Sequence, residues 1–126
     1  MKYDLVYLAV GALLGAYLRY KVTGGNLFLG TLPVSVLIVN IIGSFVLGVS
    51  STAVTQLGLD ERYTILIGIG FCGSLTTMSS FAYETVNLVS VGELATAGAD
   101  IVLNVGASLG AIIIGRALVA LLVGPG

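Results

Sequence analysis

Residues 70–84, GFCGSLTTMSSFAYE, gather five hydroxyl side chains in a stretch that carries no charge before Glu84. Successive hydroxyls at positions 76, 77, 79 and 80 point around the whole circumference of a helix, so no single polar face explains them, whereas a break in the helix would. Backbone groups freed at membrane depth need side-chain hydroxyls, an ion or a water-lined cavity as partners. The stretch therefore predicts a broken helix, the device that transporters and channels use as a binding site.

The side chains of this stretch suit an anion better than a cation. Phe81 and Met78 are three residues apart and share a face. Lipid contact or core packing is the default for such residues, but a Phe ring also has an electropositive edge that can face an anion. Asn amides and Ser or Thr hydroxyls are donors as well. A phosphate-binding loop is the rival interpretation, but the Walker pattern requires a Lys that this stretch lacks.

Two further polar stripes fall within apolar segments. Asn40 lies in LIVNIIGSFVLG with Ser44 on the same face, and Asn40 is either interhelical glue or a functional donor. Asp100, Asn104 and Ser108 recur every four residues and form one face, opposite a Gly106–Gly110 GxxxG pair that we expect to pack. A helix cap at Asp100 and a back-bonded Ser108 hydroxyl would account for those two residues, but not for Asn104.

The elements that position these residues are four membrane spans. The 126 residues are 57% hydrophobic and 9% charged, with a mean hydropathy of +1.11. A span needs about 20 apolar residues, so residues 1–126 form one all-α membrane domain with spans at about 5–20, 33–57, 63–90 and 99–123. Gly11 and Gly15 predict close helix packing in the first span. Pro33 is expected in the first turn of the second span, and residues 89–100 are expected to form the last loop.

Composition excludes several classes of protein. The chain has no His, and its single cysteine, Cys72, is expected to be a small buried hydrophobic residue. With a net charge of −1 and no Lys/Arg cluster, the chain has no basic patch of the kind that binds nucleic acid. Without a paired acid, base and nucleophile, the chain is not expected to be an enzyme.

Positive charges are almost evenly divided between the two sides of the predicted spans. Lys2, Arg62 and Arg116 fall on the side of the termini, and Arg19 and Lys21 on the other. The Lys/Arg bias that fixes orientation is therefore almost absent. Either hydrophobicity overrides this weak signal, or the protein inserts both ways and pairs with its own inverted copy.

Three motifs resemble those of the Fluc (CrcB) fluoride channels. GFCGSLTTMSSFAYE resembles the family's third-helix signature GFCGGxTTFSTFxxE, VNIIGSFVLG its VNxxGSFxxG, and GALLGAYLRY its GGxxGAxxRY. The resemblance implies an antiparallel, dual-topology homodimer in the multi-pass cell membrane of a prokaryote. It also implies passive efflux of fluoride from the cytoplasm, which protects against fluoride toxicity, through two pores.

The resemblance also implies roles for individual residues. A structural Na⁺ at the dimer centre would be held by the carbonyls of Gly73 and Thr76, and Arg19 would lie near the vestibule. The pore would be lined by side chains from three helices, namely Asn40, Ser44, Thr77, Met78, Ser80, Phe81, Asn104 and Ser108.

Two positions depart from the family pattern. Met78 stands where the family has its first pore Phe, so the aromatic pair is incomplete. Asp100 stands where a neutral polar residue or Tyr is common, and a carboxylate there would either repel anions or cap the helix. Ser74 in place of a second Gly should leave the break intact.

Two other functions compete. A small multidrug exporter would need a carboxylate in the middle of the first span, and residues 5–18 contain none. A structural subunit held by GxxxG contacts alone would leave the hydroxyl-rich break unexplained.

Overall fold

The computed structural model describes residues 3–124, so Lys2 of the charge count lies outside the described residues. The helices are α1 (Asp4–Thr23), α2 (Ser35–Leu57), a third span made of η1 (Thr64–Cys72), α3 (Gly73–Leu75) and α4 (Met78–Ser90), and α5 (Leu94–Val123). A hairpin of β1 (Phe28–Leu29) and β2 (Leu32–Pro33) joins α1 to α2. Within the described residues, four helical segments are long and apolar enough to cross a membrane, which confirms the all-α four-span fold.

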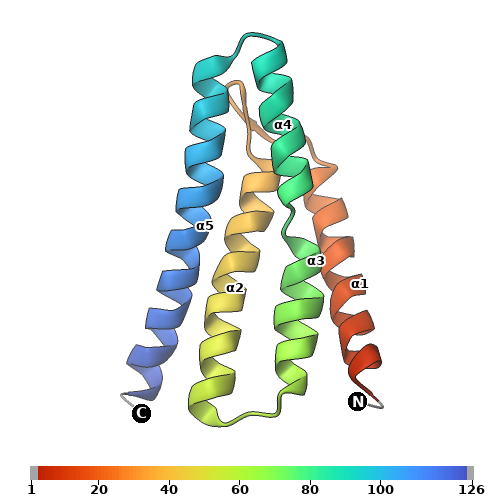
Figure 1. The fold of residues 1–126 in the computed structure, drawn as a ribbon, viewed down its shortest axis with the longest axis vertical. Coiled ribbons are helices and arrows are strands. Elements are labelled where there is room, and N and C mark those ends of the chain that lie inside the picture. The colour runs from red at the N-terminus through yellow and green to blue at the C-terminus, as the bar shows by residue number, and fades with distance from the viewer. Residues whose placement is uncertain (1–2, 125–126) are drawn as a thin grey trace.

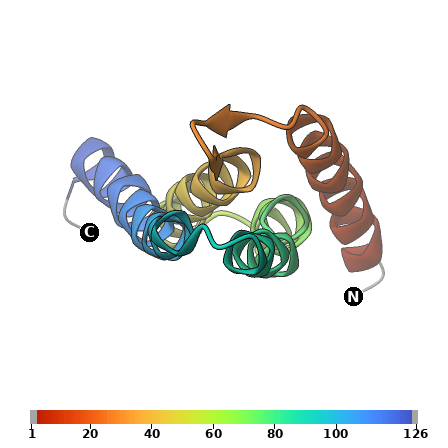
Figure 2. The ribbon, with the colours of Figure 1, turned by 90° about the horizontal axis from the view of Figure 1, so that it is seen from above.

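The spans lie side by side and alternate in direction. In Figure 1 the order across the molecule is α5, α2, the third span and α1, and the two ends of the described chain lie at the same end of the bundle. Figure 2 shows α2 and the third span in the middle, flanked by α5 and α1. This arrangement agrees with the prediction that both termini lie on one side.

Close packing depends on glycine. A Cβ at Gly11 or Gly15 would collide with the backbone of the third span, at the carbonyls of Leu66 and Phe71, so the GxxxG contact predicted for the first span is confirmed. Gly48 of α2 lies against the backbone of Ile112 in α5 in the same way. These contacts let helix backbones approach each other where apolar burial gives little driving force in lipid.

The packing predicted for Gly106 and Gly110 is not made within this subunit. A Cβ at either position would meet no described atom within 4 Å. Gly115, five residues beyond Gly110 and so on another face of α5, makes the contact with α2 instead, where it lies against the Phe45 carbonyl.

Two predicted boundaries were wrong. The fourth helix begins at Leu94 rather than at 99, because the chain reverses in a short turn where Gly92 takes a φ of +84°. Ala97 is already buried. Pro33 belongs to β2, and α2 begins after it at Ser35, whose Oγ accepts the Leu27 N–H at 2.9 Å.

Candidate functional site

The predicted break in the third span lies at Thr76 and Thr77. Both residues have extended backbones, with φ, ψ of −75°, 153° and −150°, 112°. The Thr77 Oγ1 accepts the Ser80 N–H at 3.1 Å and donates to the Ser80 Oγ at 3.0 Å. Thr77 is therefore the N-cap of α4, and its side chain satisfies an amide that the break leaves without a helical partner.

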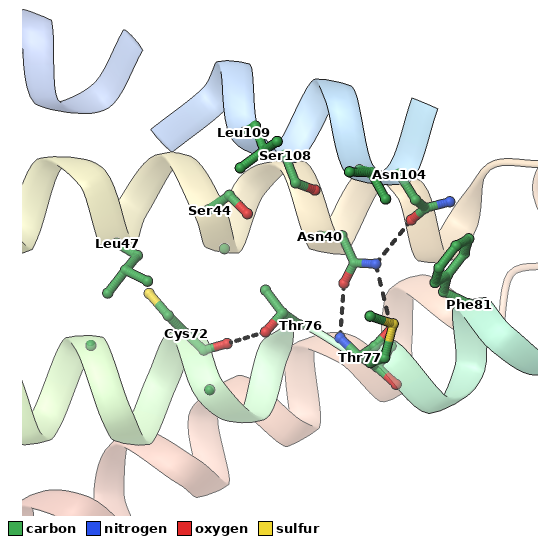
Figure 3. Close-up of a pocket in the computed structure, with 15 residues that line it drawn as sticks. Asn40, Ser44, Leu47, Cys72, Thr76, Thr77, Phe81, Asn104, Ser108 and Leu109 are labelled. Atoms are coloured by element: carbon green, nitrogen blue, oxygen red, sulfur yellow. Dashed lines mark hydrogen bonds between the residues drawn. The ribbon is translucent and has the colours of Figure 1, made fainter. Parts of the chain in front are cut away.

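Asn40 of α2 holds the break open and ties it to α5. Its Oδ1 accepts the Thr77 N–H at 2.8 Å, and its Nδ2 donates to the Asn104 Oδ1 at 2.9 Å and, more weakly, to the Thr77 carbonyl at 3.4 Å. Figure 3 shows this side chain between α5 and the break. The interhelical interpretation of Asn40 is thus confirmed, and both hydrogens of its amide face protein acceptors.

Two side chains bind the amides that would otherwise donate to the carbonyls predicted to hold Na⁺. In a continuous α-helix the Gly73 carbonyl would accept from the Thr77 N–H, and the Thr76 carbonyl from the Ser80 N–H. Those amides donate instead to Asn40 Oδ1 and Thr77 Oγ1. Neutral carbonyl oxygens are hard ligands, so both groups fit a small hard cation.

Arg19 of α1 lies at the same break. Its Nη1 donates to the Thr76 carbonyl at 3.4 Å, at the long end of the hydrogen-bond range. The position predicted for the vestibule therefore brings a fixed positive charge to one of the two candidate Na⁺ ligands. Among the described residues, no group of three His, Cys, Asp or Glu side chains could hold a metal ion.

A cavity of about 400 Å³ opens beside the break, between α2, α5 and the third span. Its lining is mostly apolar, and the buried Cys72 is part of it, as a small hydrophobic residue should be. Gly73 and Thr76 also line it. The structure brings together here seven of the residues that were predicted for the pore, namely Asn40, Ser44, Thr77, Met78, Phe81, Asn104 and Ser108.

Ser80 faces a different space. With Thr23, Ser79, Tyr83 and Glu84 it lines a second cavity of about 320 Å³. Glu84 was not predicted for any site, although it is the first charged residue after the run of hydroxyls. One of its carboxylate oxygens, Oε2, is buried and has no hydrogen-bond partner among the described residues.

Ser108 and Met78 both line the larger cavity. The Ser108 Oγ is buried and has no partner within the described structure, so the predicted back-bonding of this hydroxyl was wrong. It is a free donor beside the cavity. Met78 is 73% exposed, so the cavity opens to the surface of the subunit on that side.

Asp100 does not cap α5 and does not line the cavity. It lies within the helix and is fully buried, because α5 begins at Leu94. Its Oδ2 accepts the Thr85 hydroxyl at 2.6 Å, and its Oδ1 accepts the Asn104 Nδ2 at 2.8 Å. Thr85 was missed by sequence analysis. Thr85 and Asp100 are equally far in sequence from the turn at Gly92 and Glu93, so two helices joined by that turn would bring them together. This pairing could not be predicted while the loop was expected to run through residue 100.

The family model described as "CrcB-like protein, Camphor Resistance (CrcB)" matches residues 6–116. The chain belongs to the CrcB family. A relative from Nitrosopumilus maritimus, named fluoride-specific ion channel FluC, is 49% identical over 120 residues, which cover 95% of each chain.

Two further relatives carry the same name. The protein from Methanocaldococcus jannaschii is 40% identical over 91% of this CrcB chain and 93% of its own length. The protein from Methanococcus aeolicus is 37% identical over 90% and 92%. With four spanning helices and prokaryotic relatives of equal extent, the CrcB chain is a multi-pass protein of a prokaryotic cell membrane.

Proposed function

We propose that this CrcB-family chain is a fluoride-selective ion channel that lets fluoride leave the cytoplasm passively and so protects the cell from fluoride. The observation that carries this proposal is the 49% identity, over 95% of both chains, to a protein named as a fluoride-specific ion channel. The relatives' names describe channels and not enzymes or exporters.

The chemistry of the cavity supports an anion as the permeant species. The α4 helix begins at Met78, so its first amides have no helical acceptor and its positive dipole end points into the break. The free Ser108 hydroxyl and the Phe81 ring lie on the same cavity. A small anion there would meet donors and no fixed negative charge from the lining residues.

Asn40 was predicted as a donor to the anion, but its amide is already hydrogen-bonded within the protein. Both of its hydrogens already have acceptors, and the contact with the Thr77 carbonyl at 3.4 Å is the weaker. A passing fluoride would take the place of that carbonyl while the bond to Asn104 is kept. Asn40 can then serve both the packing of three helices and the anion.

The test is fluoride efflux from liposomes that carry the purified protein, measured with a fluoride-selective electrode. We expect fluoride to leave rapidly and chloride to be retained in parallel liposomes. Empty liposomes are the control. Efflux no faster than the empty-liposome leak, or equal efflux of chloride, would contradict the proposal.

An inverted homodimer in the lipid bilayer would complete the pathway. One subunit leaves its cavity open at Met78 and leaves Gly106 and Gly110 without contacts in the described chain, and its Lys/Arg residues are balanced between the two sides. Cysteine placed at Asn26 or at Asp60, in a Cys72→Ala background, should react from both sides of intact cells. Labelling of each site from one side only would contradict dual topology.

Na⁺ at the dimer centre is the second part of the assembly proposal. The Gly73 and Thr76 carbonyls would supply two oxygens from each subunit, and Arg19 would have to turn away from Thr76. Reconstitution with a large organic cation in place of Na⁺ should abolish fluoride efflux or weaken the dimer. Unchanged efflux and dimer stability after thorough removal of Na⁺ would overturn this site.

A further inference from the structure

Asp100 carries a fully buried carboxyl group and lies in α5, a helix that crosses the membrane. Burying such a group is costly unless its oxygens are hydrogen-bonded. Here the two oxygens have separate partners, the Thr85 hydroxyl on α4 and the Asn104 amide on α5. The two halves of the carboxyl group can therefore be tested independently.

The bond to Asn104 is one end of a chain of hydrogen bonds that crosses three helical elements. The Thr77 N–H donates to Asn40 Oδ1 at 2.8 Å, Asn40 Nδ2 donates to Asn104 Oδ1 at 2.9 Å, and Asn104 Nδ2 donates to Asp100 Oδ1 at 2.8 Å. Every bond runs in the same direction. We call these four residues, Thr77, Asn40, Asn104 and Asp100, the amide relay.

The two ends of the amide relay fix the orientation of the amides between them. A backbone N–H can only donate, so Thr77 requires the oxygen of Asn40. At the other end, the Asp100 side-chain oxygen and its backbone carbonyl, at 2.8 and 3.2 Å, require the nitrogen of Asn104. An amide can be placed in two orientations, and only one satisfies both ends.

This orientation decides which donors face the cavity. Both Asn104 hydrogens turn toward Asp100, and the Asn104 oxygen holds the Asn40 nitrogen. Without the carboxyl group the Asn104 nitrogen would keep only the longer bond to the Asp100 backbone carbonyl, at 3.2 Å, so the amide could turn over more easily and present its nitrogen to Asn40. Two NH₂ groups would then face each other, and Asn40 would lose its position at the break.

We infer that Asp100 is a positioning residue for anion passage: through Asn104 it orients Asn40 at the helix break, although it does not itself line the cavity. The inference rests on the proposed function. It assigns a role to one of the two positions at which this chain departs from the family pattern.

The experiment compares fluoride efflux for three variants in the same liposome assay. Asp100→Leu removes the side-chain acceptor and should slow efflux about tenfold or more, since the Asn104 amide loses its shorter bond and keeps only the one to the backbone carbonyl. Asp100→Asn should recover most of the rate, because its Oδ1 can still accept from Asn104 while its Nδ2 turns to Thr85. Thr85→Val, the matched control, deletes the bond to Oδ2 and the hydroxyl's contact with the Phe81 carbonyl one turn back in its own helix, keeps the bond to Asn104, and should stay within about twofold.

Two results would overturn the inference. If Thr85→Val slows efflux as much as Asp100→Leu, Asp100 merely ties α4 to α5. If Asp100→Asn is as slow as Asp100→Leu, the charge of the carboxyl group matters and its acceptor geometry does not.

A spectroscopic readout tests the amide relay independently of conduction and of whether Asp100→Leu folds. The chain has four asparagines, Asn26, Asn40, Asn87 and Asn104, so ¹⁵N-asparagine labelling gives few side-chain signals. In Asp100→Asn the Asn104 side-chain amide should shift strongly, the Asn40 amide should shift less, and Asn26 should not move. A parent protein that conducts no fluoride but shows these shifts would refute the proposed function and leave the relay standing. An Asn40 signal that does not move when Asn104 does would refute the relay.

Discussion

The two halves of α2 meet α5 in opposite ways. Near one end Asn40 reaches α5 through a hydrogen bond to Asn104 and binds the break in the third span. About two turns further along, just past the middle of the helix, Gly48 places its backbone directly against that of Ile112. The glycine contact excludes everything between the helices, whereas the polar contact lies beside a cavity of about 400 Å³. Close packing sets the spacing of the bundle, and hydrogen bonds decide what lies in the space that remains.

The physical reason is the weakness of the hydrophobic effect between helices in lipid. Association depends on van der Waals contact and on hydrogen bonds of about 1 kcal/mol each. Backbone contact through glycine can therefore hold α2 and α5 together without polar groups. The polar end can then be used for a site, because it does not have to hold the helices alone.

The largest effect should come from filling the glycine contact. In Gly48→Val a Cβ would lie against the Ile112 backbone, which cannot move aside as a side chain can. Overpacking costs about 1–3 kcal/mol and more against backbone, so we expect little monodisperse protein by size-exclusion chromatography. The control is Gly98→Ala, where the new Cβ meets no described atom within 4 Å. Equal yields of the two variants would show that spacing is not set at Gly48.

The second-largest effect should come from replacing the Asn40 NH₂ donor by an acceptor at the polar contact. Asn40→Asp can still accept the Thr77 N–H, but it places an acceptor opposite Asn104 Oδ1. At about 2–3 kcal/mol for such a mismatch, fluoride efflux should fall about 100-fold while the protein remains folded. Asn26→Asp, in the connection before the hairpin, is the matched control and should conduct normally. Normal efflux through Asn40→Asp would leave Asn40 a packing residue only.

Phe81 tests whether the apolar lining contributes more than volume. Phe81→Ile keeps a large apolar side chain but removes the electropositive ring edge, whose interactions are about 0.5–1.5 kcal/mol. Fluoride efflux should fall up to about tenfold. Phe28→Ile, on the exposed hairpin strand, serves as the control. If both Phe variants conduct like the parent protein, the ring at 81 is only packing.

The smallest effect on fluoride itself is expected at Met78, on the open side of the cavity. Met78→Phe should keep or raise fluoride efflux, because it restores the second ring of the family pattern. Met78→Ala should widen the opening and admit chloride, since the flexible thioether now fills that space. Unchanged selectivity in Met78→Ala together with a blocked Met78→Phe would show that Met78 does not stand in for a ring.

Much of the fold and part of the site were predictable from sequence. Hydropathy gave four spans, and the crowding of hydroxyls gave a break that the structure places at Thr76 and Thr77. The predicted starts of the second and fourth helices, at Pro33 and at residue 99, were wrong. Short turns set these starts, and short turns depend on a few contacts, such as that between Leu27 and Ser35. Spacing also could not tell which glycines of α5 pack, since helix rotation in the bundle depends on all its neighbours.

The sequence by itself determined the chemistry available to this protein: apolar spans without central charge, a run of hydroxyls that no regular helix face accommodates, and an Asn, an Asp and a second Asn in apolar surroundings. Only the tertiary structure decided how these polar groups are used. Asn40, Asn104 and Asp100 lie on two helices, and their donors and acceptors can be matched in several ways until the helices are set side by side. The carboxylate that seemed placed to repel an anion is buried against Thr85 and Asn104, because the turn at Gly92 sets α4 against α5 in that register.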